Sequence, residues 1–323
     1  MTKKIIFTIL CVFCITTAFS QEKTFSFSGK PIVTIFGNYH AGLGHANKES
    51  GFELDRSYLG YQFSVTKELS GKVVFDIGTS KVEGSDLERI AYVKNAMLTW
   101  QTGNFSLDFG LIGLEQFNIQ EKFWGYRYIW KSFQDEYKFN SSADMGILAK
   151  YKFNSWLSAD LSFINGEGYK KLNKDNRYRY SAGITINPVK SLTLRAYYDL
   201  YNGKGGDEKN QQSLALFAGY KHEKFYAGIE YNNLFNTKFQ DDKNQTGYSA
   251  YASVDVYKKI ALFGRYDNLT SKDDWNSGDQ QRALIGVQYS PNKYLQISPN
   301  FQTVNPRTGK SSSYIYLNVG FKI

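Results

Sequence analysis

The segment FSLDFGLI, residues 105–112, shows the pattern that decides the fold of this chain. Its residues alternate between apolar and polar, and in an extended strand successive side chains point to opposite faces. The same alternation runs through RYRYSAGITI at 177–186 and through the last residues, 312–323. A repeat of two residues predicts strands with one apolar and one polar face.

Sixteen segments of this kind follow one another along the chain. An even number suits an antiparallel up-and-down barrel whose two ends lie on the same side. Pro299 falls inside one segment and removes a hydrogen-bond donor, so a bulge or bend is expected there. The windows are 32–43, 53–66, 72–79, 90–101, 104–112, 142–152, 156–165, 177–187, 191–201, 211–221, 224–234, 246–257, 260–269, 280–290, 293–303 and 312–323.

The connections between these segments alternate in length. Short turns occur near 67–71, 102–103, 153–155, 188–190, 222–223, 258–259 and 291–292. Longer polar links, rich in glycine and aspartate, occupy 44–51, 80–89, 113–141, 166–176, 202–210, 236–245, 270–279 and 305–311. This alternation is typical of periplasmic turns and extracellular loops. The sequence therefore predicts an all-β, 16-stranded antiparallel transmembrane β-barrel, whereas a soluble sandwich has no reason to alternate so regularly.

The first residues have the features of a secretory signal peptide. Lys3 and Lys4 precede an apolar run at 5–17, and small residues follow at Ala18 and Ser20. We expect cleavage after Ser20, which leaves 21–323 as a single barrel. Both cysteines lie in the removed segment, so the mature chain has no disulfide, thiolate metal site or cysteine nucleophile.

The composition excludes some partners and activities. Aromatic residues make up 17% of the chain, which also has 28 glycines, yet mean hydropathy is negative. That combination suits a single-layer wall between lipid and water. The formal charge is +9, or +7 without Lys3 and Lys4, and the basic residues form no cluster of the kind that nucleic acid would need. His40, His45 and His222 belong to no catalytic or metal-binding motif, so we expect no enzyme activity, cofactor or metal.

The third long connection, 113–141, contains the aromatic block FWGYRYIWKSF at 123–133. So many rings are unusual in a loop surrounded by water. We expect this loop to fold into the barrel and narrow it, because charged side chains at a narrowing select ions. A helical surface cap or an oligomer contact is the alternative. The candidate constriction residues are Glu115, Glu121, Lys122, Arg127, Lys131, Asp135 and Glu136.

Charged residues also recur on the polar face of the predicted strands. A charge that faces lipid near the midplane costs a few kcal/mol, so these side chains are expected in the lumen. They could set an anion preference, or they could pair across strands and only hydrate the lumen. The basic residues are Arg56, Arg177, Arg179, Arg195, Arg265 and Arg282; the acidic residues are Asp76, Asp108, Asp160, Asp199, Glu230 and Asp255.

Several strings resemble a known family. FELDRSYLGYQFS at 52–64 resembles an early strand of phosphate-selective porins. The strings at 95–100, 123–139, 141–147 and 164–170 are similar to those of related Gram-negative outer-membrane porins. The resemblance implies a 16-stranded, trimeric porin with an inward-folded third loop. The chain departs from it by lacking an obvious ladder of basic residues and by ending in Ile323, with Phe321 as the nearest aromatic.

These expectations together predict a passive channel for small hydrophilic solutes, with a mild anion preference. It would lie in the outer membrane of a Gram-negative cell, against lipid and lipopolysaccharide, as a homotrimer that binds no nucleic acid. An active transporter of 22 strands with a plug domain would need a longer chain. A secreted β-rich protein that binds carbohydrate or a partner is the alternative, and it would stay soluble after export.

Overall fold

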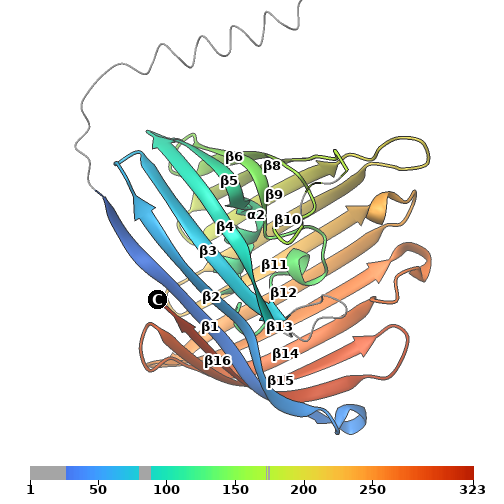
Figure 1. The fold of residues 1–323 in the computed structure, drawn as a ribbon. Coiled ribbons are helices and arrows are strands. Elements are labelled where there is room, and N and C mark those ends of the chain that lie inside the picture. The colour runs from blue at the N-terminus through green and yellow to red at the C-terminus, as the bar shows by residue number, and fades with distance from the viewer. Residues whose placement is uncertain (1–26, 80–88, 172, 174) are drawn as a thin grey trace, which may run out of the picture.

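The computed structural model describes residues 27–79, 89–171, 173 and 175–323. Within them the chain forms a closed antiparallel barrel of sixteen strands, in which sequence neighbours pair and β1 (Ser28–Leu43) closes on β16 (Ser312–Lys322) (Figure 1). The predicted up-and-down barrel is confirmed. The expected signal peptide, 1–20, lies outside the described residues.

The strands agree with the sequence pattern, and their edges differ from the predicted windows by at most four residues. The others are β2 (Ser50–Ser64), β3 (Leu69–Thr79), β4 (Arg89–Thr102), β5 (Phe105–Gly113), β6 (Ala143–Lys152), β7 (Leu157–Ile164), β8 (Arg179–Val189), β9 (Leu192–Tyr201), β10 (Gln211–Lys221), β11 (Phe225–Phe235), β12 (Gln245–Tyr257), β13 (Ile260–Ser271), β14 (Gln280–Tyr289) and β15 (Leu295–Pro306).

Helical segments occur only in the long connections of the described chain. α2 (Glu115–Trp124) and α3 (Phe133–Glu136) lie in the third connection, and α2 ends at Gly125, whose φ of 75° is left-handed and favours glycine. Single turns of 3-10 helix are η1 (Gly44–Ala46), η2 (Thr237–Phe239) and η3 (Lys272–Asp274). In the described ranges no helix has the length and apolarity to cross a membrane.

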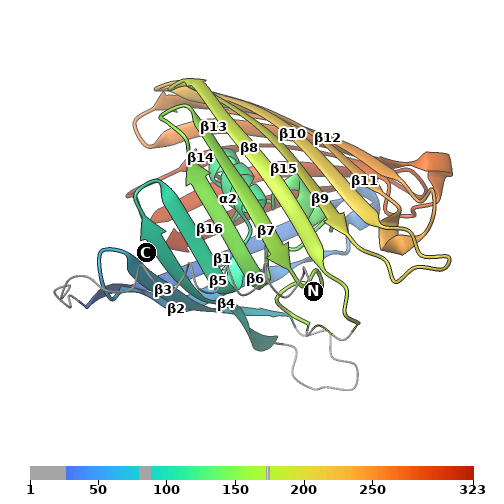
Figure 2. The same cartoon turned by 90° about the horizontal axis from the view of Figure 1, so that it is seen from above.

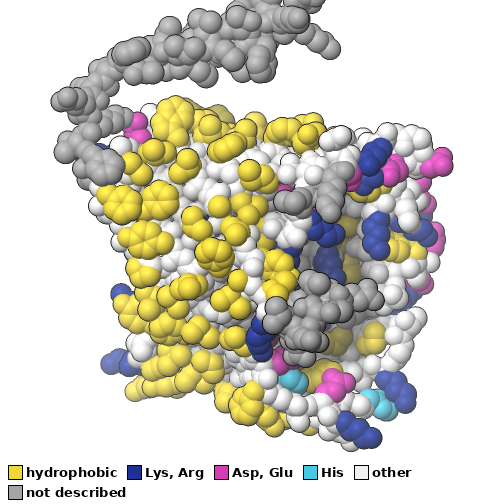
Figure 3. All heavy atoms as spheres, in the orientation of Figure 1, with side chains coloured by type: hydrophobic (Ala, Val, Ile, Leu, Met, Phe, Trp, Pro, Cys, Tyr) yellow, Lys and Arg dark blue, Asp and Glu magenta, His cyan; other side chains and the backbone are white. Residues whose placement is uncertain are grey.

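The two faces of the wall differ as the alternation predicts. Outward side chains such as Phe109, Leu161 and Ile285 are exposed, whereas inward Asp76 and Asp199 are buried. Figure 3 shows apolar side chains spread over the outer wall, while lysines and arginines gather in a hollow. The outer face is therefore suited to lipid, and the polar groups lie inside.

Pro299 does not shift the register, so the expected bulge is absent. Gly286 pairs with Asn300 and Tyr289 with Ile297 in one register, but the pairs between them are missing. On its other side Pro299 pairs with Leu317 of β16 without a break. The missing N–H of Pro299 thus interrupts the ladder toward β14 and leaves the neighbouring pairs in place.

Candidate functional site

The third connection lies inside the barrel. Seen from above, α2 falls within the ring of strands (Figure 2). The backbone of the third connection accepts hydrogen bonds from inward wall residues. Arg265 Nη1 donates to the Lys131 carbonyl over 2.7 Å, and the Tyr226 hydroxyl donates to the Trp124 carbonyl over 2.6 Å. The connection is therefore attached to the inner face of β11 and β13.

The aromatic block packs as an apolar cluster against one side of the interior. Trp124, Tyr126, Tyr128 and Ile129 are buried there, and the ring centroids of Tyr126 and Phe263 are 4.3 Å apart. The sequence signal for this contact is a set of apolar residues on the polar face of the strands. The wall partners are Phe36, Phe217, Tyr251, Phe263 and Leu284.

The polar ends of two buried tyrosines are hydrogen-bonded to the wall. The Tyr126 hydroxyl lies 2.6 Å from Ser253 Oγ, and the Tyr128 hydroxyl lies 2.5 Å from Ser298 Oγ. Burial raises the pKa of the Tyr128 phenol, so it stays neutral. These bonds fix the connection to β12 and β15.

A wall glycine makes room for the connection. A side chain at Gly247 of β12 would overlap the ring of Phe133 in α3. Phe133 belongs to a second buried cluster with Phe139, Leu234 and Leu269. The close approach of α3 to the wall therefore requires glycine at this position.

The charged residues of the connection mainly pair with one another. Arg127 lies 3.1 Å from Glu121 and 3.6 Å from Asp135. Lys131 lies 3.7 Å from Glu136. Lys122 is exposed and has no carboxylate within ion-pair distance among the described residues, and Glu115 lines a hollow at the short-turn end. Of these seven residues, Lys122 and Glu115 are thus the two without an ion pair in the described chain, and their charges are opposite.

Four of the six predicted wall arginines pair with an aspartate, three of them across strands and Arg265 along its own strand β13. This is the second of the two alternatives that the sequence left open, and it neutralises the arginines. The pairs are Arg56 with Asp76 at 3.0 Å, Arg179 with Asp199 at 2.6 Å, Arg195 with Asp160 at 2.7 Å, and Arg265 with Asp267 at 2.8 Å.

The other two arginines have different surroundings. Arg177 precedes β8, so its predicted place in the wall is wrong; it pairs with Glu208 at 2.6 Å in the long connections. Arg282 does face inward, where it stacks on Trp130 and donates to Gln302. Only Arg282 of the six has no carboxylate within 4 Å in the described part of the chain.

Burial of the inward side chains differs around the barrel. Under the third connection the inward residues of β9–β13 are mostly buried, for example Phe217 and Glu230. On β2–β6 several inward residues are buried as well, Ile112 and Leu148 among them against Phe117 of the third connection, and others are partly exposed instead. Water therefore has access along the β2–β6 side. The partly exposed residues are Tyr58, Lys72, Tyr92, Lys94, Met97, Thr99 and Lys150.

Two hollows lie at opposite ends of the interior. The hollow among the long connections measures about 810 Å³, and the one at the short-turn end about 280 Å³. Figure 3 shows lysine and arginine side chains in the hollow at the long-connection end. Its lining includes Arg56, Lys131, Lys138, Tyr169, Lys170 and Arg179; the other includes Gln101, Ser106, Glu115, Lys150 and Asp160.

The sequence prediction included Lys122 but missed three other lysines on the water-accessible side, Lys72, Lys94 and Lys150. Lys72 and Lys94 face inward from the adjacent strands β3 and β4, and Lys150 faces inward from β6. Lys150 is neutralised by Asp108 at 2.9 Å, whereas Lys72, Lys94 and Lys122 have no such partner in the described chain. Strand parity was sufficient to find Lys72, because it shares the inward face of β3 with Asp76.

A second segment, at the long-connection end, is hydrogen-bonded to β6 along its backbone and reaches β3 through a side chain. We call residues 165–171 the strap. One end is held because Asp144 accepts hydrogen bonds from the amides of Gly166 and Gly168, at 2.8 and 3.0 Å. At the other end the Tyr169 hydroxyl donates to Asp76 Oδ2 of β3 over 2.6 Å. Burial and the Asp76 charge raise the pKa of Tyr169, so the phenol remains a donor.

The strap also carries a perturbed carboxyl group. Burial, followed by the charge of nearby Asp175, raises the pKa of Glu167. Glu167 lines the hollow at the long-connection end. Its protonation would therefore change the charge of that hollow at a higher pH than an ordinary glutamate.

The described residues contain no group of three or more histidine, cysteine, aspartate or glutamate side chains suited to a metal. The sequence also lacks catalytic motifs. The features of the interior are its two hollows and its charged inward side chains.

Comparison with known proteins gives relatives in fold only. No family model and no curated sequence matches the chain. An anion-selective porin from Comamonas acidovorans superposes with a TM-score of 0.71 at 10% identity, covering 92% of this chain and 100% of the porin. The outer membrane channel DcaP of Acinetobacter baumannii has a TM-score of 0.66 at 13% identity, covering 92% and 98%.

OmpT of Vibrio cholerae, expressed in the outer membrane, is similar as well, with a TM-score of 0.66 at 11% identity and coverage of 94% and 99%. Such low identity establishes the fold alone. The chain therefore has the barrel fold of outer-membrane channels, whereas membership of the phosphate-selective family is not supported by any of these matches.

Proposed function

We propose that this protein is a passive channel of a Gram-negative outer membrane, exported by a cleaved signal peptide, through which small hydrophilic solutes diffuse with a mild preference for anions. The supporting observation is the water-accessible side of the interior, where Lys72, Lys94 and Lys122 have no carboxylate partner in the described chain. Fixed positive charge beside a narrow water path attracts anions and repels cations.

Transport needs no chemical step. Solutes would enter the hollow of the long connections, pass the partly exposed inward side chains of β3 and β4, and leave through the hollow at the short turns. The third connection and the strap reduce the cross-section, and the lysines bind anions weakly enough for release. Lys122 would be the main positive charge of the constriction, because Arg127 and Lys131 are paired with carboxylates.

The soluble alternative has no observation in its favour. A secreted binding protein would leave outward residues such as Phe109, Leu161 and Ile285 in water. Exposed apolar surface forfeits about 25 cal/mol for each Å² that lipid would otherwise cover. An outer wall of this kind is suited to a membrane.

Phosphate selectivity is not part of the proposal. Arg179, Arg195 and Arg265 are each engaged by an aspartate and cannot form a free basic ladder. A homotrimer is part of it: the resemblance implies one, and a fold relative, in-vitro folded OmpT, has a trimer form. Outer-membrane lipid and lipopolysaccharide would surround the outer wall.

Planar bilayers test the proposal. The mature protein should add stepwise, ohmic conductance, and its reversal potential in a KCl gradient should show preference for chloride. The triple variant K72Q/K94Q/K122Q should lose that preference, whereas K67Q/K190Q/K310Q, which removes three exposed lysines elsewhere, should keep it.

Two results would contradict different parts of this proposal. A folded barrel that inserts without conducting would exclude a channel. An unchanged reversal potential in the first triple variant would leave the channel intact but remove the lysines as its selective element.

A further inference from the structure

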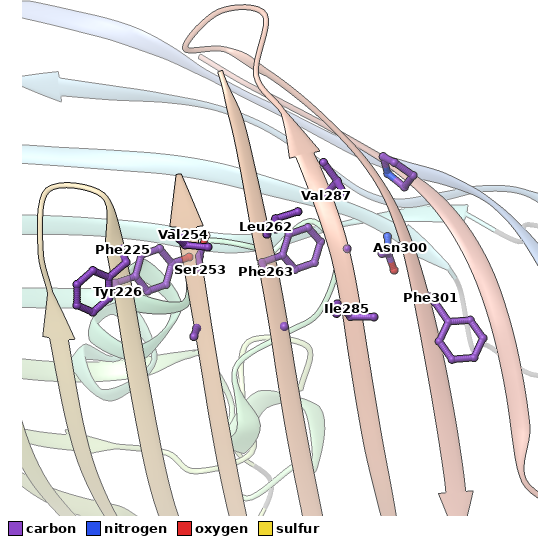
Figure 4. A pocket seen from close by; sticks show the side chains of 14 residues that line it. Phe225, Tyr226, Ser253, Val254, Leu262, Phe263, Ile285, Val287, Asn300 and Phe301 are labelled. Carbon is purple, nitrogen blue, oxygen red and sulfur yellow. The ribbon is translucent and has the colours of Figure 1, made fainter. Parts of the chain in front are cut away.

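An apolar groove lies on the outer face of β11–β15 (Figure 4). Its volume is about 730 Å³, and most of its lining side chains point away from the lumen. The groove is separate from the polar interior proposed as the channel. Its outward lining includes Phe225, Val254, Leu262, Ile285, Val287 and Phe301.

The recess has two local causes. Ala252 and Gly264 place small residues at outward positions on adjacent strands. Beside them, the ladder between β14 and β15 lapses next to Pro299. Larger side chains such as Leu262 and Phe301 surround these positions, and the outer surface is hollowed between them.

The short turns beneath the groove are rich in lysine. Leu262, in the groove, is three residues from Lys259, a rise of about 10 Å along the strand. All five lysines of these turns are exposed, and no carboxylate of the described residues lies within ion-pair distance of them. They are Lys221, Lys224, Lys258, Lys259 and Lys293.

We propose that the groove and this lysine rim bind one anionic phospholipid. An acyl chain fills the apolar groove, and its phosphate lies among the rim lysines about 10 Å away along the wall. The short-turn end of an outer-membrane barrel faces the periplasm, whose leaflet consists of phospholipid. Lysines with no carboxylate partner among the described residues, beside an apolar groove, match both parts of such a lipid. The lipid site requires only that the barrel lies in the outer membrane, as proposed above. It does not require that the barrel conducts ions.

Native mass spectrometry of the delipidated mature protein tests the site. After incubation with equal amounts of palmitoyl-oleoyl phosphatidylglycerol and phosphatidylcholine, one phosphatidylglycerol should be retained preferentially. K258Q/K259Q should weaken retention about fivefold for each lysine removed. G264L should abolish it by filling the groove; a Cβ at Gly264 meets only the Leu284 carbonyl, at 3.4 Å.

Exposed lysines on other short turns supply the control. K67Q/K190Q removes two of them from the same rim and should retain phosphatidylglycerol as the wild type does. Heat-shifted gel migration verifies that every variant is folded. Equal retention of both lipids, or retention that neither K258Q/K259Q nor G264L lowers, would overturn the site. So would lipid-free oligomers that G264L dissociates, because a second copy would then occupy the groove.

Discussion

At the residue scale, the inner wall depends on buried ion pairs. Arg195 and Asp160 are almost wholly buried and are joined by hydrogen bonds of 2.7 and 3.0 Å. Gln116 of the third connection also accepts a hydrogen bond from Arg195. A buried charge that loses its counter-charge is strongly unfavourable, so the two members depend on each other.

Asp160→Asn should therefore destabilise the barrel by about 3–5 kcal/mol, because it leaves the Arg195 charge buried and uncompensated. Asp274→Asn breaks the exposed pair with Arg307 and should cost less than about 1 kcal/mol. Urea titration of protein refolded into lipid vesicles measures both free energies of unfolding. Equal effects would mean that water reaches the Arg195 pair.

Glu167 predicts a pH effect on ion preference. Its pKa is raised, so as pH falls from 7 it takes up a proton before ordinary glutamates do. The hollow then loses a negative charge, and the anion preference should increase. Glu167→Gln should show a higher anion preference at pH 7 and a smaller change between pH 7 and 5, read from reversal potentials.

Glu223→Gln, in a short turn at the opposite end, serves as the control and should behave as the wild type. An identical pH response in Glu167→Gln and the wild type would assign the effect to other carboxyl groups.

At the element scale, two segments narrow the interior in different ways. The third connection is held by apolar clusters and by hydrogen bonds to several strands. The Tyr169 phenol attaches the strap to β3, three strands from β6. Other hydrogen bonds hold the strap to β6, so the Tyr169 phenol is the hydrogen bond that joins it to β3.

Tyr169→Phe removes that bond and keeps the ring. The strap should leave β3 for part of the time, so single-channel conductance should rise and become noisier. Tyr178→Phe changes a tyrosine whose ring packs on outward-facing Phe163 and should leave the current unchanged. Identical currents in Tyr169→Phe and the wild type would mean that other contacts hold the strap.

Gly247→Ala should displace the third connection. The new Cβ overlaps Phe133, and such overpacking costs about 1–3 kcal/mol. Trypsin should then cleave faster at Lys131 and Lys138. Gly264→Ala, with an open outward position, is the matched control. Equal cleavage rates in both variants would show that α3 adjusts without leaving the wall.

At the scale of the whole molecule, the barrel could be predicted and much of its interior could not. The repeat of two residues and the alternating connection lengths specify strands and closure, because both are local properties. The partner of a charge is not local: Arg195 meets an aspartate 35 residues away. Arg177 was placed in the wall by the sequence because the alternation of polar and apolar residues already begins two residues before the first residue of β8.

The proposed trimer is a prediction at this scale. Protein extracted in mild detergent should sediment with three times the mass of the denatured chain and should dissociate on heating. A single-chain mass at all protein concentrations would contradict the trimer without affecting the barrel.

Tyr128 links the two ends of the chain. Its ring lies 6.3 Å from that of Phe36 on β1, its hydroxyl meets Ser298 on β15, and its carbonyl accepts from Asn318 on β16. A residue from the middle of the polypeptide thus bridges the first strand and the last two. All three contacts can form only after β1 has paired with β16. Closure of the barrel and packing of Tyr128 therefore stabilise each other.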